Sequence, residues 1–331
     1  MPTPLAPLTT LRVGGSASTF IRASSDAELI DAITQHPGAE IIGGGSNVVI
    51  SDDGLDTVIA VATSGVAIER SDDVVVITAA AGESWDELVA NAVDHQWSGI
   101  EAMSGIPGLV GAAPMQNIGA YGQELAERCV SVRVLDKHAG EVIELGSRAC
   151  AFGYRSSRFK VESGRFVVLS VTMRLSTTGL GIVKYAQLAE RLGVRVGDAV
   201  PAHEILVAVR ELREAKGMLL DPADHDTWST GSYFTNPIVD AVAPDGCPTY
   251  PTDGGVKLSA AWLIEHAGIQ RGFGLNDRAT VSTKHTLALT NRGNASAQDI
   301  VELAGVIFER VRDAFGIELE NEPRLLGRFG E

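Results

Sequence analysis

The sequence predicts an α+β fold, in which strands and helices do not follow the regular alternation of a doubly wound parallel sheet. Residues after Val130 alternate between apolar and polar side chains, residues 136–140 supply a hairpin turn, and residues 142–145 continue the pattern. Helices with an apolar face occur both before and after these strands, and the chain contains no internal repeat. Hairpins mixed with helices in this way are typical of α+β architecture.

The N-terminal part divides into short elements with clear boundaries. Ser25 and Glu28 have the spacing of a capping box, so we expect a helix through Ile30 and Ile33. Ser84 and Glu87 repeat that spacing before a second expected helix. Apolar and β-branched runs predict strands at residues 40–42, 48–50 and 74–80.

The C-terminal part contains longer helices. Residues 166–175 read as a strand, and an irregular loop with Tyr185 follows. Residues 201–215 have helical spacing of their apolar side chains. Ser296 and Asp299 cap a last helix that runs to Phe315, and Gly316 is its expected C-cap.

Charge and composition exclude several classes of protein. The net charge of −15 disfavours nucleic acid and anionic membrane surfaces as partners. Cys129, Cys150 and Cys247 are widely spaced and odd in number, which argues against a disulfide framework. We find neither a signal peptide nor an apolar stretch of membrane-spanning length. We therefore expect a cytoplasmic protein.

Glycine-rich segments are the first candidates for a binding site. Residues 43–47, GGGSN, form a turn between two expected strands, whereas a Rossmann motif or P-loop needs a helix directly afterwards. Residues 103–125 hold a second, longer run of small residues with the amides of Gln116 and Asn117. The two segments are either ordinary turns or the two sides of one dinucleotide site, because glycine lets the backbone approach a ligand closely.

Polar residues elsewhere are weaker candidates. Residues 152–160 gather Arg155, Arg158 and Lys160, which form either a solvated strand edge or an anion clamp. Ser232 lies on a glycine turn and Glu322 precedes a proline, and each alone would be read as an ordinary turn or surface residue. The seven histidines are scattered, so we expect no metal site.

Taken together, these motifs resemble the UDP-N-acetylenolpyruvoylglucosamine reductases, flavoenzymes of peptidoglycan precursor synthesis. The resemblance covers essentially the whole chain in order: residues 43–47, 106–125, 153–160, 231–237, 254–268 and 321–323. The segment around Tyr185 is similar to the tyrosine loop of the longer subtype. One departure is a third glycine in the first motif, where some members have an acidic residue.

The resemblance implies a fold and a reaction. The fold would be the FAD-binding unit of the vanillyl-alcohol-oxidase-like (PCMH-type) superfamily in two subdomains, residues 1–62 with 320–331 and residues 63–200. A smaller α+β substrate-binding domain, residues 201–319, would complete it, and the C-terminal strand would return to the first subdomain. The reaction would be NADPH-dependent, FAD-mediated reduction of an enolpyruvyl ether of a UDP-sugar to UDP-N-acetylmuramate.

The resemblance also implies roles for individual residues. Catalysis would fall to Ser232 as proton donor, with Arg155 and Glu322 holding the carboxylate. Noncovalent FAD binding would involve Gly43, Gly44, Gly45, Ser46, Asn47, Ser104, Gly105, Ile106, Pro107, Gly108, Gly111, Ala112, Gln116, Asn117, Gly119, Ala120 and Tyr121. Substrate binding would involve Tyr121, Tyr154, Tyr185, Arg213, Lys216, Asn236, Lys257 and His285.

Two alternatives remain open from the sequence. A flavin-dependent alcohol oxidase of the same superfamily often tethers its flavin through His or Cys, and residues 103–125 contain neither. A non-catalytic nucleotide-binding module would have signalled itself by loss of Arg155, Ser232 or Glu322, and all three are present. We expect a monomer whose partners are the UDP-sugar and NADPH, with no metal, nucleic acid or membrane.

Overall fold

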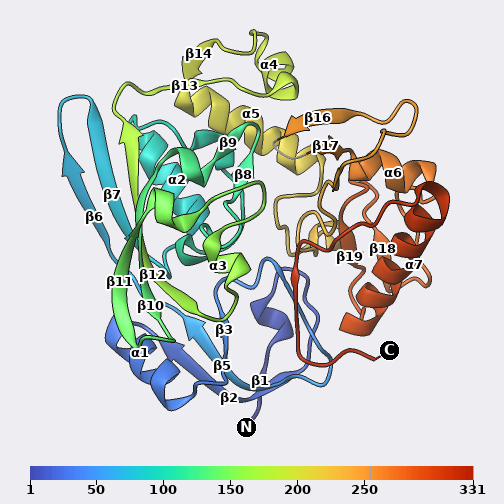
Figure 1. Ribbon diagram of the computed structural model, residues 1–331, viewed down its shortest axis with the longest axis horizontal. Helices are drawn as coiled ribbons and strands as arrows, with labels where there is room; N and C mark the ends of the chain where they lie inside the picture. The colour runs from blue at the N-terminus through green and yellow to red at the C-terminus, as the bar shows by residue number, and fades with distance from the viewer. Residues whose placement is uncertain (253–254, 331) are drawn as a thin grey trace. The chain divides into compact units, whose positions relative to one another are not determined.

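The computed structural model describes residues 1–252 and 255–330 (Figure 1). The chain forms two compact units. Unit 1 consists of Met1–Phe20, Gly45–Thr57 and Lys216–Glu331, and unit 2 consists of Ile21–Gly44 and Val58–Ala215. Strands β2 (Ser16–Ala23) and β5 (Leu55–Val61) each run from one unit into the other. The division into three domains stays a prediction, and Gly254 of the fifth family motif lies outside the described residues.

Unit 2 is built around a five-stranded antiparallel sheet in the order β11-β10-β12-β7-β6. The strands of this unit are β3 (Glu40–Ile42), β6 (Val66–Arg70), β7 (Val74–Ala80), β8 (Gly119–Ala120), β9 (Gln123–Glu124), β10 (Cys129–Asp136), β11 (Glu141–Gly146), β12 (Phe166–Ser176), β13 (Leu180–Ile182) and β14 (Ala199–Pro201). Its helices are α1 (Asp26–Gln35), α2 (Trp85–Asp94), α3 (Arg158–Val161), α4 (Ala186–Leu192) and α5 (Ala202–Ala215).

Helices cover both faces of the long strand β12. Trp85 and Val89 of α2 share one buried cluster with Val171 of β12, whereas Leu29 of α1 shares another with Leu169. Strand β12 is therefore buried along most of its length, although β7 alternates strictly between buried and half-buried side chains. Figure 1 shows α2 beside β7 and β12.

The capping residues that the sequence predicts are confirmed. The side chains of Ser25 and Ser84 accept hydrogen bonds from the backbone N–H groups of Glu28 and Glu87. Each such cap stabilises a helix by about 1 kcal/mol, because it satisfies an otherwise unpaired N–H. The predicted strands at residues 40–42, 48–50 and 74–80 have those bounds in the structure.

The expectation of an irregular loop around Tyr185 is wrong. Tyr185 is the N-cap of α4, and this helix lies between β13 and β14, which pair with each other. Leu188 and Ala189 are buried with Ile205 and Val209 of α5. The apolar side chains of α4 thus have a helical partner, which favours a helix over an irregular loop.

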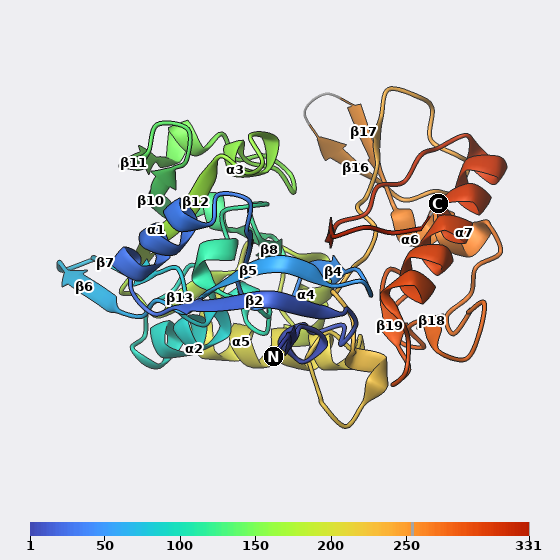
Figure 2. The ribbon, with the colours of Figure 1, turned by 90° about the horizontal axis from the view of Figure 1, so that it is seen from below.

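Unit 1 has its core around the long helix α7 (Ala297–Phe315) (Figure 2). Ile300, Leu303 and Ile307 are fully buried in a cluster that also includes α6 (Ala260–His266). Ser296 and Asp299 form the predicted capping box, and Gly316 ends the helix in a left-handed conformation. The strands of this unit are β1 (Thr3–Pro4), β4 (Val48–Ile50), β15 (Ile238–Val239), β16 (Thr249–Thr252), β17 (Gly255–Leu258), β18 (Ala279–Val281), β19 (Leu289–Asn291) and β20 (Arg324–Leu326).

The C-terminal strand returns to the N-terminal part of the chain, as the resemblance implies. Strand β20 pairs in parallel with β4, with Arg324 opposite Val48 and Leu326 opposite Ile50. Because β4 directly follows the turn at residues 43–47, this pairing fixes Glu322 beside the end of that turn. No helix among the described residues is long and apolar enough to cross a membrane.

Candidate functional site

The two glycine-rich segments touch each other in unit 2. A Cβ atom added to Gly44 would lie 2.9 Å from the Cα atom of Gly108, and one added to Gly43 would meet the side chain of Leu109. Gly108 has a φ of +116°, a conformation that residues with a Cβ rarely adopt. The backbones of the two turns therefore form a close cradle, which no side chain can fill. A cradle of this kind suits the pyrophosphate of a dinucleotide.

A carboxylate holds the second segment in place. Asp86 Oδ1 accepts hydrogen bonds from the Gly105 backbone N–H at 2.5 Å and from Ser104 Oγ at 3.2 Å. Arg210 Nη1 of α5 donates to Asp86 Oδ2 at 2.8 Å. Neither Asp86 nor Arg210 is predicted from the sequence, because a first-turn Asp and a mid-helix Arg carry no local signal for this contact. Together they connect α5 to two predicted flavin-binding residues.

The side-chain amide of Asn117 forms its hydrogen bonds with other groups of the protein. Asn117 is buried with a φ of +47°, and its Nδ2 donates to Glu124 Oε2 at 2.8 Å and to the Gly153 carbonyl at 3.1 Å. Its Oδ1 accepts from the Ala126 N–H at 2.9 Å. Asn117 thus ties the glycine-rich segment to the turn that carries Arg155.

Arg155 is held close to that segment in a strained conformation. Its φ is +47°, which costs a residue with a Cβ on the order of 1 kcal/mol or more. Its Nη2 donates to the Gly119 carbonyl at 3.0 Å, and Lys160 Nζ donates to the Arg155 carbonyl at 3.0 Å. Such strain persists where the surroundings fix the backbone, and it is frequent at functional sites.

Tyr121 and Arg213 form a half-buried polar group close enough to Arg155 to interact with its charge. Burial lowers the pKa of Arg213; Tyr121 opposes this shift, while the positive charge of Arg155 adds to it. Burial likewise raises the pKa of Tyr121, with Arg213 opposing. The ring of Tyr185 meets that of Tyr121 edge to face. Four of the predicted catalytic and substrate-binding residues therefore lie together in unit 2: Tyr121, Arg155, Tyr185 and Arg213. A fifth, Tyr154, precedes Arg155 in the chain.

In unit 1, Ser232 and Glu322 lie on neighbouring chain segments. The Glu322 N–H donates to the carbonyl of Tyr233 at 2.7 Å, and Phe234 forms a β-bridge with Asn321. Tyr233 and Phe234 are buried, so they anchor the segment that carries the half-buried Ser232.

Asn47, at the end of the first glycine-rich turn, is hydrogen-bonded to the segment that carries Glu322. Asn47 Nδ2 donates to the Glu322 carbonyl at 3.4 Å, and the Arg324 N–H donates to the Asn47 carbonyl at 3.0 Å. A Cβ added to Gly45 would meet the backbone of Leu8 and Thr9. A predicted flavin-binding residue, Asn47, is therefore fixed against a predicted catalytic residue.

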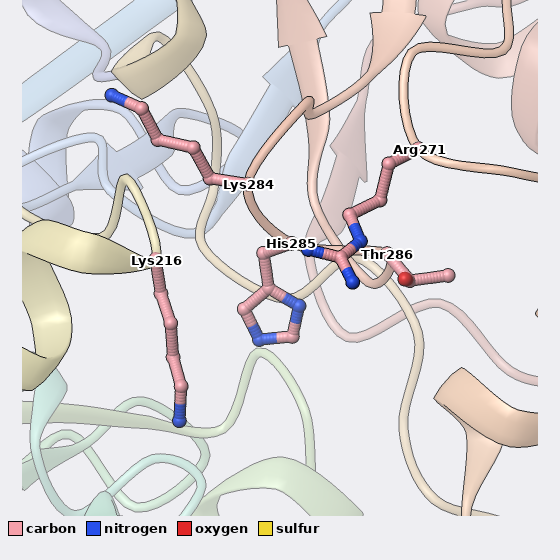
Figure 3. Close-up of a pocket in the computed structure, with 5 residues that line it drawn as sticks. All are labelled: Lys216, Arg271, Lys284, His285 and Thr286. Atoms are coloured by element: carbon pink, nitrogen blue, oxygen red, sulfur yellow. The ribbon is translucent and has the colours of Figure 1, made fainter.

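The remaining predicted substrate residues lie in unit 1. Asn236 Oδ1 accepts from the Ala260 N–H, at the start of α6, at 2.9 Å. Lys257 of β17 lies over the ring of Tyr250, with 5.8 Å from Nζ to the ring centroid. Lys216 and His285 line a pocket of about 220 Å³ together with Arg271, Lys284 and Thr286 (Figure 3). The sequence analysis did not include Arg271, which had no motif around it.

A metal centre receives no support. Within residues 1–252 and 255–330, no three side chains of His, Cys, Asp or Glu gather as a metal site would require. Besides the carboxylates of Asp86, Glu124 and Glu322, the polar groups described above are cations, amides and hydroxyls. The cations are suited to bind anionic groups.

Known proteins are similar to this chain over its whole length. A family profile described as FAD binding domain matches residues 17–146, and one described as UDP-N-acetylenolpyruvoylglucosamine reductase, C-terminal domain, matches residues 221–326. The UDP-N-acetylenolpyruvoylglucosamine reductase of Cutibacterium acnes is 48% identical, over 98% of this chain and 89% of the relative. That of Streptomyces coelicolor is 45% identical, with the same coverage of both chains.

A solved structure is similar in fold. The crystal structure of UDP-N-acetylenolpyruvylglucosamine reductase from Thermus caldophilus superposes with a TM-score of 0.67 at 24% sequence identity. The match covers 99% of this chain and 98% of that one. This match confirms the α+β fold predicted from the sequence, and the profile described as FAD binding domain confirms the flavin-binding unit.

Proposed function

Because the chain belongs to the UDP-N-acetylenolpyruvoylglucosamine reductase family, we propose that it reduces UDP-N-acetyl-3-O-(1-carboxyvinyl)-glucosamine to UDP-N-acetylmuramate with NADPH. The geometric observation that carries the proposal is the pairing of Ser232 and Glu322 on segments joined by the hydrogen bond from Glu322 N–H to Tyr233. The proposed proton donor and the Glu322 carboxylate thus lie on two chain segments that are hydrogen-bonded to each other.

The residues of the glycine-rich segments fit FAD. Where Gly44 contacts Gly108, there is no side chain, so only backbone groups would face a pyrophosphate. Asp86 holds the neighbouring Ser104 and Gly105 through hydrogen bonds. FAD supplies the redox chemistry: when bound, it accepts a hydride from NADPH and delivers it to the terminal vinyl carbon of the substrate. Binding is noncovalent, since neither segment contains His or Cys, and acid precipitation should release all flavin into the supernatant.

Arg155 would stabilise charge on the substrate. Addition of hydride to the vinyl carbon leaves negative charge on the adjacent carbon and its carboxylate. A guanidinium is a permanent cation with a planar fork of donors, which matches a carboxylate. The hydrogen bond from Arg155 Nη2 to the Gly119 carbonyl restricts the position of the guanidinium, which reduces the reorganisation needed during the reaction.

Ser232 would donate a proton to the same carbon, and Glu322 would hold and polarise the carboxylate. Serine is a weak acid, so its hydroxyl must be positioned accurately to act. The backbone hydrogen bonds of Gly231 N–H to Ser229 Oγ and of Tyr233 N–H to Leu287 fix the residues on either side of Ser232.

The residues that the resemblance assigns to the UDP-sugar are Tyr121, Tyr154, Tyr185, Arg213, Lys216, Asn236, Lys257 and His285. These cations give anionic ligands local attraction in a chain with a net charge of −15. We further propose that the protein is a cytoplasmic monomer with the three-domain division given by the resemblance; the three unbridged cysteines support a reducing compartment.

Steady-state turnover tests the proposal. Under anaerobic conditions, purified, FAD-loaded protein should oxidise NADPH beyond the one equivalent that reduces its flavin only when the enolpyruvyl UDP-sugar is added, and the product should be heavier by two hydrogens in mass spectrometry. UDP-N-acetylglucosamine, which lacks the enolpyruvyl group, is the matched control and should support no repeated turnover. Repeated oxidation of NADPH without the UDP-sugar, or oxidation of simple alcohols, would contradict the proposal.

A further inference from the structure

Glu101 is a buried carboxylate to which neither the resemblance nor the proposed mechanism assigns a role. It is fully buried, and it forms no ion pair with any cation of residues 1–252 and 255–330. It opens the 3₁₀ helix Glu101–Met103, which leads directly into the predicted flavin-binding residues Ser104 and Gly105. Burial of a carboxylate is costly unless hydrogen bonds compensate it, so its hydrogen-bond partners indicate what it does.

The Glu101 carboxylate accepts two hydrogen bonds from different parts of unit 2. Its Oε2 accepts from the Gly99 N–H, and its Oε1 accepts from Gln123 Nε2 at 2.7 Å. Gln123 is 4% exposed, and its Oε1 accepts from the Ala102 N–H at 2.8 Å. The side-chain amide of Gln123 is therefore bound at both ends, once by the Glu101 carboxylate and once by the backbone next to it.

Gln123 directly follows a hairpin turn that places Tyr121 in a strained conformation. Strands β8 and β9 contain two residues each, with Ala120 opposite Gln123 (Figure 1). The two turn residues, Tyr121 and Gly122, have φ values of +46° and +85°. Such a turn favours glycine or asparagine, and a tyrosine in it costs on the order of 1 kcal/mol or more. Because so short a hairpin is marginally stable alone, it needs contacts from other elements to hold it.

Neighbouring backbone leaves the carboxylate and the turn little room to move. A Cβ atom added to Gly181 of β13 would lie 2.0 Å from Glu101 Oε1. A Cβ atom added to Gly122 would lie 2.6 Å from the Cβ atom of Lys184, the residue before Tyr185. The segment that leads to Tyr185 therefore packs closely against both the Glu101 carboxylate and the hairpin turn.

We propose that Glu101 is a positioning residue, which through Gln123 holds the hairpin so that Tyr121 is correctly placed to bind the UDP-sugar. This inference rests on the proposed function, in which Tyr121 binds the substrate. The flavin-binding segment has an anchor of its own, because Asp86 holds Ser104 and Gly105. Loss of the Glu101 contact should therefore weaken binding of the UDP-sugar more than binding of the flavin.

Exchange of the two side chains tests this link at constant net charge. In Glu101→Gln two amides face each other, so one N–H group of the network loses its acceptor. In the double variant Glu101→Gln/Gln123→Glu, the amide at position 101 donates to the carboxylate at position 123, which still accepts from the Ala102 N–H. The network is then complete again, with one hydrogen bond reversed in direction.

Anaerobic stopped-flow spectroscopy of FAD-loaded protein measures flavin reoxidation against UDP-sugar concentration. We expect Glu101→Gln to raise the UDP-sugar dissociation constant about 10-fold, the low end of what a hydrogen bond to a charged group contributes. The rate of flavin reduction by NADPH should stay near that of wild type. The double variant should recover most of the lost affinity, because the two substitutions are coupled. Glu87→Gln, at an exposed position of α2, removes the same charge and should change neither measurement.

Three results would overturn the inference while leaving the proposed function intact. They are an unaltered UDP-sugar constant in Glu101→Gln, a double variant that binds no better than Glu101→Gln, and equal impairment of flavin reduction and reoxidation. The last result would assign Glu101 to general stability. If Glu101→Gln does not fold, Gln123→Ala breaks the same link from the hairpin and should raise the constant in the same way.

Failure of the proposed function has a different signature. If wild-type protein shows no reductase turnover, amide hydrogen exchange of residues 119–124 still tests the link between Glu101 and the hairpin. Protection of the hairpin that falls in Glu101→Gln and returns in the double variant would support it. Equal exchange in wild type and Glu101→Gln would overturn it.

Discussion

The rings of Tyr121 and Tyr185 meet edge to face, with centroids 5.6 Å apart and planes at 89°. Tyr121 belongs to the second glycine-rich segment and has a φ of +46°, whereas Tyr185 begins α4 and is 43% exposed. Tyr121, which the resemblance assigns to both flavin and substrate binding, thus packs against Tyr185, which it assigns to substrate binding alone. Edge-to-face pairs contribute about 0.5–1.5 kcal/mol beyond burial of their area.

Replacement of Tyr185 should affect the substrate and leave the reductant unchanged. We expect Tyr185→Ala to weaken binding of the UDP-sugar about 3- to 30-fold, while the rate of flavin reduction by NADPH stays near that of wild type. Tyr185→Phe keeps the ring contact with Tyr121 and isolates the contribution of the hydroxyl. An unaltered Michaelis constant of Tyr185→Ala for the UDP-sugar would exclude a role in binding it.

Loss of the Asp86 carboxylate should loosen the flavin. Asp86→Ala leaves the Gly105 N–H and the Arg210 guanidinium without their shared acceptor, so the second glycine-rich segment loses its anchor. Since hydrogen bonds to charged groups contribute about 1.5–3 kcal/mol, the FAD dissociation constant should rise at least 10-fold in fluorescence titration. The neighbouring exposed Glu87→Ala is the control. Equal FAD affinity in both variants would show that Asp86 does not organise this segment.

Acid should selectively remove a stabilising contact in unit 2. The Arg165 guanidinium lowers the pKa of Asp136 to about 2, against about 3.9 in an unfolded chain. A lowered pKa stabilises the folded state fully above about pH 4, and this contribution is lost as the pH falls towards 2. Asp136→Asn should therefore lower the free energy of unfolding most at pH 7.

Urea unfolding of both proteins at pH 7, 5, 4 and 3 measures that difference in the free energy of unfolding. The difference in the free energy of unfolding between wild type and Asp136→Asn should be similar at pH 7 and pH 5. This difference should become smaller below pH 4. Asp31→Asn, at an exposed position of α1, controls for the loss of one negative charge. If the difference in the free energy of unfolding stays constant or becomes larger on acidification, the stabilising role of the Asp136–Arg165 pair is contradicted.

Local signals in the sequence were enough to predict the longer helices α1, α2, α5 and α7 and several of the strands. Serine caps at Ser25, Ser84 and Ser296 mark helix starts because they act on the next three residues. The segment around Tyr185 was misjudged since its order depends on packing of α4 against α5, a contact between residues well apart in sequence. Local patterns carry no information on such pairs.

The candidate site likewise contains residues that the sequence predicts and residues whose role is visible only in the fold. Glycine-rich segments and the resemblance identified the residues near the ligands, but the contact of Gly44 with Gly108 joins turns 64 positions apart. The anchors Asp86 and Arg210 occupy ordinary helical positions, so only their juxtaposition in the fold indicates a role. Asn117 was expected to offer its amide to a ligand, whereas that amide contacts Glu124, Gly153 and Ala126.

Ser232 should separate the two half-reactions. Flavin reduction by NADPH needs no proton at carbon, whereas reduction of the enolpyruvyl group does. We expect Ser232→Ala to be reduced at a near-normal rate and reoxidised by substrate about 10²–10⁴-fold more slowly, the usual contribution of a general acid. Ser232→Cys, with a more acidic group, should recover part of the rate. Equal slowing of both half-reactions in Ser232→Ala would assign the serine to the turn alone.

The central claim is that this chain transfers reducing equivalents from NADPH to an enolpyruvyl UDP-sugar through bound FAD. Anaerobic stopped-flow spectroscopy of the wild-type protein tests it most directly. The oxidised-flavin absorption should disappear on addition of NADPH and return fully when the UDP-sugar is added after removal of excess NADPH. A protein that takes up no FAD, or whose reduced flavin is not reoxidised by this substrate, would contradict the account.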